Sequence, residues 1–159
     1  MLTHRGADAD VAMSVDDESR GTLVWFGLAG PVLTALAEGS VLLAHELDAS
    51  LHPALVVELV RLFQDPATNP ARAQLIFNSH DAALLGEPGT VSPLGRDQVW
   101  FTEKRDDGGS RLYGLADLAP RKEEAIGRRY LAGRYGAVPI LSRQQFADAV
   151  RPATAEHSR

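Results

Sequence analysis

The chain has 159 residues, which is enough for one domain with a hydrophobic core. Its composition, 45% hydrophobic and 23% charged, is that of an ordinary soluble globular protein. The formal net charge of -5 gives no overall basic field for nucleic acid or an anionic membrane, and the absence of Cys excludes disulfides, thiolate metal sites and a cysteine nucleophile.

The N-terminal residues do not resemble a secretion signal, because MLTHRGADAD has neither a basic start nor an apolar core. The longest apolar stretch, LVWFGLAGPVLTALA (residues 23–37), is interrupted by Gly27, Gly30 and Pro31. It also falls short of the roughly 20 residues that span a bilayer. We therefore expect a buried helix rather than a membrane segment, and a cytoplasmic protein.

A hairpin is expected to precede this helix. The pattern LTHRGADADVAMSV predicts two short strands around a polar turn at residues 6–10. Ser19 is a good helix N-cap and Gly39 a stop signal. Pro31 either kinks the apolar helix or begins a second one.

Strands and helices alternate in the middle of the chain. Residues 41–46 (VLLAHE) and 74–77 (QLIF) are short apolar runs, typical of strands buried on both faces of a parallel sheet. Between them PALVVELVRLFQ predicts a helix that begins at Pro53. Its expected apolar face consists of Leu55, Val56, Leu59, Leu62 and Phe63. Asp81 can cap a short helix after the second strand, and the alternation indicates an α/β fold.

The C-terminal third predicts a second hairpin, formed by QVWFTEK and RLYGL with two glycines in the turn. RKEEAIGRRYLAGRYG then predicts a charged amphipathic helix, and residues 151–159 are expected to be a disordered tail. The arginines of this helix are expected on a solvated face, although tyrosines beside them leave a partner surface open. These residues are Arg128, Arg129, Arg134, Tyr130 and Tyr135.

A zinc site is one interpretation of the cluster HELDASLH, which offers His45, Glu46, Asp48 and His52. Zinc proteases place two His four residues apart on one helix face. Here position 49 is Ala, and the two His stand seven apart across a strand end and a loop. Zinc is therefore the weaker interpretation, and His52 before Pro53 is expected to be structural.

A nucleotide site is the stronger interpretation, because three segments suit one. They are ESRGT (18–22) at a helix start, VLLAHELDAS (41–50) at a strand end and LIFNSHD (75–81) at the next strand end. Free N–H groups at a helix start favour phosphate. A Glu at a strand end can activate water, and a His on the adjacent strand can donate to phosphate. In open α/β sheets, ligands bind outside the carboxyl ends of the strands.

On these segments the chain resembles the C-terminal half of an ABC/SMC-like ATPase of the prokaryotic AAA-family ATP-binding proteins. Members of that group often belong to phage-defence and abortive-infection systems. The resemblance runs from about Leu2 to Leu141 and includes LGRDQVWFTEK, LADLAPRKEEAI and YLAGRYGAVPIL. It implies a partial ABC-type P-loop NTPase fold over residues 1–150, with a signature helix, a Walker B strand, a switch-histidine strand, and a C-terminal hairpin and helix.

The resemblance also implies roles for single residues. Glu46 matches the catalytic carboxylate after the Walker B strand, and His80 matches the switch histidine. Asp48 and Ser50 are the ends of the matching D-loop. In that family the ABC signature contacts the γ-phosphate of ATP held by a partner subunit. The residues that match this signature are Ser19, Arg20, Gly21 and Thr22.

Two departures from the family pattern matter. His45 stands where the family has the Asp that holds Mg²⁺, and imidazole is a poor substitute for the oxygen ligands that this ion demands. No G-x-x-x-x-G-K-[ST] occurs, because Lys104 follows Glu103 and Lys122 follows Arg121. The phosphate-binding loop is therefore expected upstream of these residues, or lost.

The sequence thus predicts the signature, Walker B and switch half of an ATP-binding and ATP-hydrolysing domain, inactive alone. ATP and Mg²⁺ would be bound through a partner that carries the P-loop. Further partners would be an effector nuclease or toxin, with nucleic acid reached only through the full complex. The alternative is a degenerate, non-catalytic adaptor that docks onto an intact ATPase or defence complex.

Overall fold

The computed structural model describes residues 1–5, 9–86, 92–121, 124–139 and 142–150 as a mixed α/β protein. Its strands are β1 (Leu2–His4), β2 (Val11–Met13), β3 (Val41–Ala44), β4 (Gln74–Phe77), β5 (Trp100–Lys104) and β6 (Ser110–Gly114). Its α-helices are α1 (Arg20–Glu38), α2 (Pro53–Gln64), α3 (Ile126–Leu131) and α4 (Arg143–Ala149). Within these ranges the strands form three separate pairs: β1 and β2 are antiparallel, β3 and β4 parallel, and β5 and β6 antiparallel.

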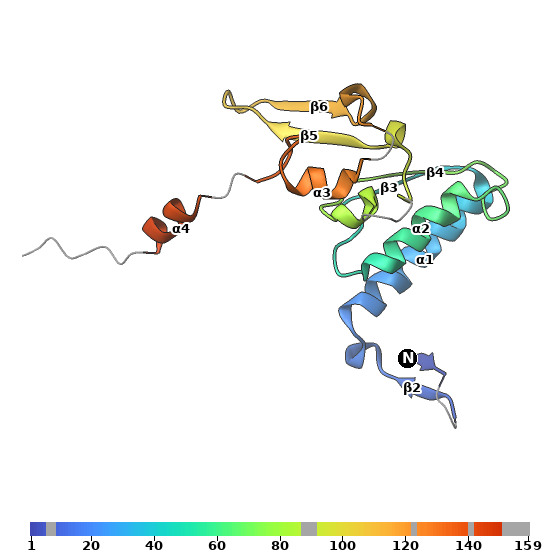
Figure 1. Ribbon diagram of the computed structural model, residues 1–159. Helices are drawn as coiled ribbons and strands as arrows, with labels where there is room; N and C mark the ends of the chain where they lie inside the picture. Colours follow the sequence, from blue (N-terminus) through green and yellow to red (C-terminus); the bar gives the residue numbers. More distant parts are fainter. Residues whose placement is uncertain (6–8, 87–91, 122–123, 140–141, 151–159) are drawn as a thin grey trace, which may run out of the picture.

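The centre of the fold is the unit β3–α2–β4. Val41 pairs with Gln74 and Ala44 with Phe77, which confirms the predicted parallel pairing. In Figure 1, α1 and α2 lie beneath the two strands, and both helices contribute residues to one core. The buried core of this unit lies between the helices, the strands and the loop after β3. It consists of Val32, Leu47, Leu51, Val56, Leu59, Val60 and Leu84.

One face of the β3–β4 pair is open, and the expectation of strands buried on both faces is wrong. Leu42 and Phe77 pack against the core, whereas Val41, Leu43 and Ile76 on the other face are exposed. Leu43 leaves 72% of its surface accessible. Side chains alternate across a strand, so helices on one face cover only every second residue. No described residue supplies the second covering layer.

Helix α1 has the predicted ends. Ser19 Oγ accepts a hydrogen bond from Thr22 N (3.1 Å), and Gly39 closes the helix with φ of 69°. A Cβ at Gly39 would lie 2.4 Å from the Ala71 carbonyl oxygen, so position 39 requires glycine. Pro31 lies inside one continuous helix, so no second helix begins there.

Only one face of α1 is buried, which corrects the expectation of a buried helix. Val32 and Ala35 face the core, but Leu33 is exposed on the opposite face, and so is Phe26, at 64%. By length and composition α1 could cross a membrane, with a mean hydropathy of 1.3. Only 11% of this apolar window is buried, and a single helix of this kind is weak evidence for a membrane span.

The C-terminal part has its own small core around β5, β6 and α3. Phe101 stacks on Tyr130 and Tyr135, with ring centroids 5.4 and 5.9 Å apart. Tyr113 donates a hydrogen bond to the carbonyl of Tyr135 (2.5 Å). A long helix is expected from the sequence between residues 121 and 136, but α3 spans only Ile126–Leu131, so this expectation is wrong. Residues 122–123 of the expected helix lie outside the described residues. Figure 1 shows that the β1–β2 hairpin and α4 project from this body.

Glu124 makes the C-terminal core sensitive to acid. Burial alone would raise its pKa, but the hydrogen bond from Tyr135 Oη (3.0 Å), a backbone hydrogen bond at Arg121 and the charge of Arg129 lower the pKa below its ordinary value. Because the pKa of Glu124 is lower in the folded than in the unfolded chain, the ionised carboxylate stabilises the fold. This stabilisation is complete above roughly pH 5 and is lost as the pH falls through the pKa of Glu124 in the folded chain.

We therefore expect Glu124→Gln to destabilise the chain at about pH 7, and this deficit to shrink in acid, where the wild type also becomes protonated. Urea unfolding across the pH range checks this. The control is Glu58→Gln, which removes a carboxylate that is exposed on α2 beside Arg61. A deficit of Glu124→Gln that stays constant from neutral pH to acid would contradict the assignment.

Candidate functional site

The carboxyl ends of β3 and β4 are joined through Asn78. The Glu46 N–H donates to Asn78 Oδ1 (2.9 Å), and the Leu47 N–H donates to the Asn78 carbonyl (3.2 Å). The Asn78 N–H in turn donates to the Ala44 carbonyl (3.4 Å). Asn78 therefore fixes the direction in which the chain leaves β3. The sequence interpretation gave it no role, because its hydrogen-bond partner Glu46 lies 32 positions away in the sequence.

The loop after β3 is held in an unusual backbone conformation. Glu46 has φ of 50° and Ser50 has φ of 68°, both in the left-handed region that non-glycine residues seldom adopt. Such a residue costs of order 1 kcal/mol and persists only where the surroundings fix it. The Asn78 hydrogen bond does so for Glu46. Positive φ at non-glycine residues also occurs away from this loop, at Arg72, Ala119 and Ala137.

Asp48 faces the loop that follows β4. The His80 N–H points at Asp48 Oδ2 (3.4 Å), a long hydrogen bond. Asp48 Oδ1 is buried, with no hydrogen-bond partner in the part of the chain that the structure describes. The His80 side chain itself is exposed. Asp81, the next residue, caps the following 3-10 helix through a bond from Ala83 N (2.8 Å), as predicted.

The start of α1 lies against the same loop. A Cβ at Gly21 would stand 2.8 Å from the Ser50 carbonyl oxygen, so these two backbones touch. Ser19 Oγ caps the helix and lies 2.9 Å from Thr22 Oγ1. Arg20 is exposed beside it. The three segments that the sequence singled out therefore meet at one end of the β3–β4 pair.

His45 and His52 do not join this cluster as metal ligands. The His45 side chain is exposed, and His52 Nδ1 accepts a hydrogen bond from Ala54 N (3.2 Å) at the start of α2, the structural role expected for it. Within the described residues no three His, Asp or Glu side chains are grouped so that they could hold a metal ion. The residues present therefore do not fit a complete magnesium site on this chain.

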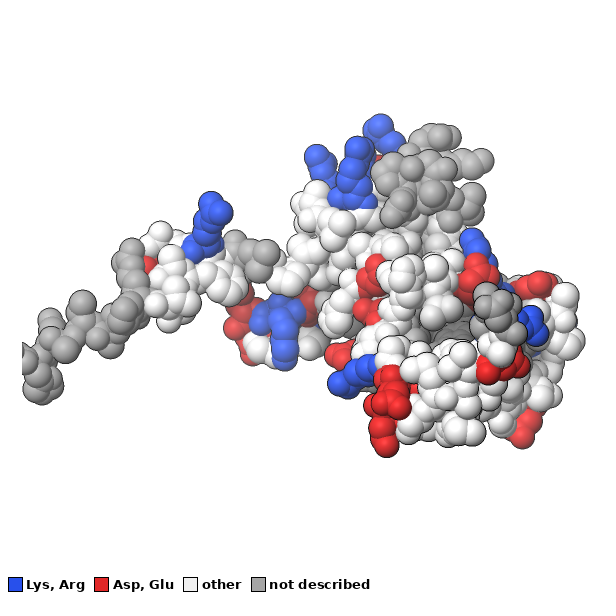
Figure 2. Space-filling model, turned by 90° about the horizontal axis from the view of Figure 1, so that it is seen from below, with Lys and Arg blue, Asp and Glu red and all other residues white. Residues whose placement is uncertain are grey.

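The arginine and tyrosine residues of the predicted helical segment at residues 121–136 do not form one surface. Tyr130 and Tyr135 stack on Phe101 inside the C-terminal core, and Arg129 pairs with Glu124 at 3.1 Å. Arg128 and Arg134 remain exposed. In the view of Figure 2, acidic and basic side chains are interspersed over the lower part of the face, and several basic side chains stand together at its upper edge.

Comparison with known families matches the N-terminal part of the chain. The family described as "AAA domain, putative AbiEii toxin, Type IV TA system" matches residues 1–86. This range contains the start of α1, the loop after β3 and the loop after β4. No curated protein and no solved structure matches the chain. Because the match covers more than half of the 159 residues, the chain belongs to this family of AAA domains.

Proposed function

We propose that this chain supplies the signature, Walker B, D-loop and switch side of an ATP site in an ABC-type AAA-family ATPase. The observation that carries the proposal is the contact of Gly21 with Ser50, which joins the start of α1 to the carboxyl ends of β3 and β4. Ligands of open α/β sheets bind at that end. Membership of an AAA domain family supports nucleotide binding in general.

The proposed roles follow the chemistry of the side chains. The exposed Ser19 and the free N–H groups at the start of α1 would contact the γ-phosphate of ATP held by a partner subunit. Glu46, exposed at the end of β3, would orient and deprotonate the attacking water. His80 would donate a hydrogen bond to the γ-phosphate, whose negative charge increases during hydrolysis. Asp48 would steady the switch loop through the His80 N–H.

The phosphate-binding loop must come from outside these residues, because no P-loop sequence occurs among them. The open face of the β3–β4 pair, made of Val41, Leu43 and Ile76, is the surface on which we place the structure that carries it. Burying three exposed aliphatic side chains contributes several kcal/mol to such docking. The complete assembly would be cytoplasmic and would act with an effector nuclease or toxin.

Magnesium would be held mainly by the P-loop side and by ATP. The His45 imidazole offers no oxygen to a hard cation, and the described residues show no grouped ligands. This favours the second candidate, a non-catalytic adaptor that keeps the docking surface but not the chemistry.

A fusion protein distinguishes the two candidate functions, the ATPase half and the non-catalytic adaptor. The P-loop-bearing half of an intact family member is joined ahead of Met1, and ATP binding and hydrolysis are measured for the fusion and for each half. We expect the fusion to bind and hydrolyse ATP, and the chain alone to show no turnover. Leu43→Lys should weaken association of the separate halves at least about tenfold, since it buries a charge in an apolar interface. The control is Leu112→Lys at a similarly exposed site on β6.

Each other outcome has a defined meaning. A fusion that binds ATP without turnover, even after His45→Asp, would support the adaptor. A fusion that binds no ATP would overturn both candidates. Turnover by the isolated chain, abolished by Glu46→Gln, would overturn the division of the site between two halves.

A further inference from the structure

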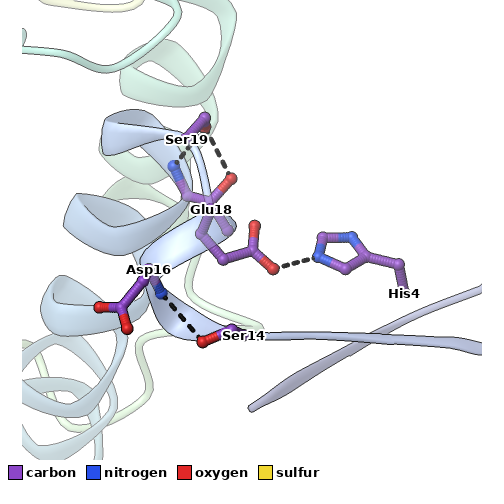
Figure 3. Close-up of polar contacts among 6 residues, drawn as sticks. His4, Ser14, Asp16, Glu18 and Ser19 are labelled. Atoms are coloured by element: carbon purple, nitrogen blue, oxygen red, sulfur yellow. Dashed lines mark hydrogen bonds and ion pairs between the residues drawn. The ribbon is translucent and has the colours of Figure 1, made fainter.

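A histidine of the N-terminal hairpin contacts a buried carboxylate beside the start of α1. His4 Nε2 lies 2.5 Å from Glu18 Oε1. The Glu18 side chain is only 3% exposed, whereas that of His4 is 45% exposed. Figure 3 shows the Glu18 carboxylate turned toward the His4 ring. A buried carboxylate is costly unless a donor satisfies it, and His4 is the side chain that does so here.

Glu18 is rigidly connected to the segment at residues 19–22. It ends a short 3-10 helix, where its N–H donates to the Val15 carbonyl (3.3 Å), and Ser14 Oγ caps the start of that helix through Asp16 N (3.4 Å). The next residue, Ser19, caps α1. One peptide bond joins the two caps, so we expect a shift of Glu18 to be transmitted to Ser19.

His4 in turn is fixed by the hairpin. It pairs with Val11 in the antiparallel register of β1 and β2, which fixes the position of its backbone in the hairpin. The His4–Glu18 contact therefore joins the β1–β2 hairpin to the start of α1, between residues 14 positions apart in the sequence.

We propose that His4 is a positioning residue for residues 19–22, acting through Glu18, and that the β1–β2 hairpin is thereby a structural brace for the signature segment. The functional part of this inference rests on the proposed ATP site. Its structural part does not, because the geometry of the helix start can be measured without nucleotide.

Amide hydrogen exchange in the full chain tests the structural part. The reporters are the N–H groups of Thr22 and Leu23, which bond to Ser19 Oγ and to the Ser19 carbonyl, each at 3.1 Å. We expect His4→Ala to speed their exchange about tenfold, since a hydrogen bond to a charged group is lost. His4→Gln, whose amide can still donate, should restore exchange to within about threefold. Thr3→Ala, exposed on the same strand, is the control.

A second variant separates coupling from simple loss of folding. In a Glu18→Ala background, His4→Ala should change exchange by less than about twofold, because the group that His4 satisfies is gone. Unchanged exchange in His4→Ala, or equal loss in His4→Ala and His4→Gln, would overturn the positioning role.

The functional part is tested in the fusion with the P-loop half. His4→Ala should raise the KM for ATP about tenfold, and His4→Gln should reverse most of this. Altered exchange with unaltered ATP kinetics would uphold His4 as a positioning residue and would overturn the phosphate-binding role of residues 19–22. Unaltered exchange would overturn the inference about His4 while leaving the ATP site standing.

Discussion

Glu46→Gln should lower kcat of the fused ATPase at least about a hundredfold, the usual effect of removing a general base. The amide has nearly the same shape as the carboxylate but cannot accept the proton of the attacking water. The backbone at position 46 should not move, since its N–H is held by Asn78 Oδ1 irrespective of the side chain. Affinity for ATP should therefore change less than about threefold.

Single-turnover hydrolysis and binding of a fluorescent ATP analogue measure the two effects separately. Glu58→Gln is the matched control, because Glu58 is exposed on α2 and belongs to none of the three converging segments. A variant that retains more than about a third of the wild-type kcat would remove Glu46 from the mechanism.

Leu59→Ala should destabilise the chain by about 3 kcal/mol. Leu59 on α2 is fully buried, at 0% exposure, among core residues from α1, α2 and the loop after β3. Truncation removes hydrophobic burial and leaves a cavity that α1 and the strands cannot collapse into without losing their own contacts. The expected loss is a large share of the 5–15 kcal/mol that holds a typical domain.

The control for this effect is Leu55→Ala, one turn earlier on the same helix, where the residue is 39% exposed. It should cost less than about 1.5 kcal/mol, because less area is lost and no closed cavity forms. Urea unfolding followed by circular dichroism compares the two variants. Equal losses of stability in the two variants would mean that α2 packs against the core with a different face.

The elements of this fold could be predicted where a local signal marks them. Ser19, Gly39, Pro53 and Asp81 each occupy the helix end that their backbone chemistry favours. The convergence of three segments could be predicted as well, because parallel strands present their carboxyl ends at one edge. The roles assigned to those segments remain predictions.

Packing between distant residues could not be predicted in this way. Hydrophobic spacing placed Leu55 on the buried face of α2, yet Val60 is buried and Leu55 is 39% exposed. The difference is a small rotation of the helix about its axis, which depends on what α2 packs against. The Asn78 clamp and the His4–Glu18 contact likewise join residues with no local relation, 32 and 14 positions apart.

The outward side of α1 has a consequence for the life of the protein in a cell. Phe26 and Leu33 stand open there, and the charges of the helix lie only at its ends, Arg20 and Glu38. Chaperones and proteases recognise accessible apolar segments of this kind. The docking proposed above uses the face of the β3–β4 pair that points away from the helices, so it would leave Phe26 and Leu33 accessible. Only a contact that covers α1 itself would then protect this chain from such degradation.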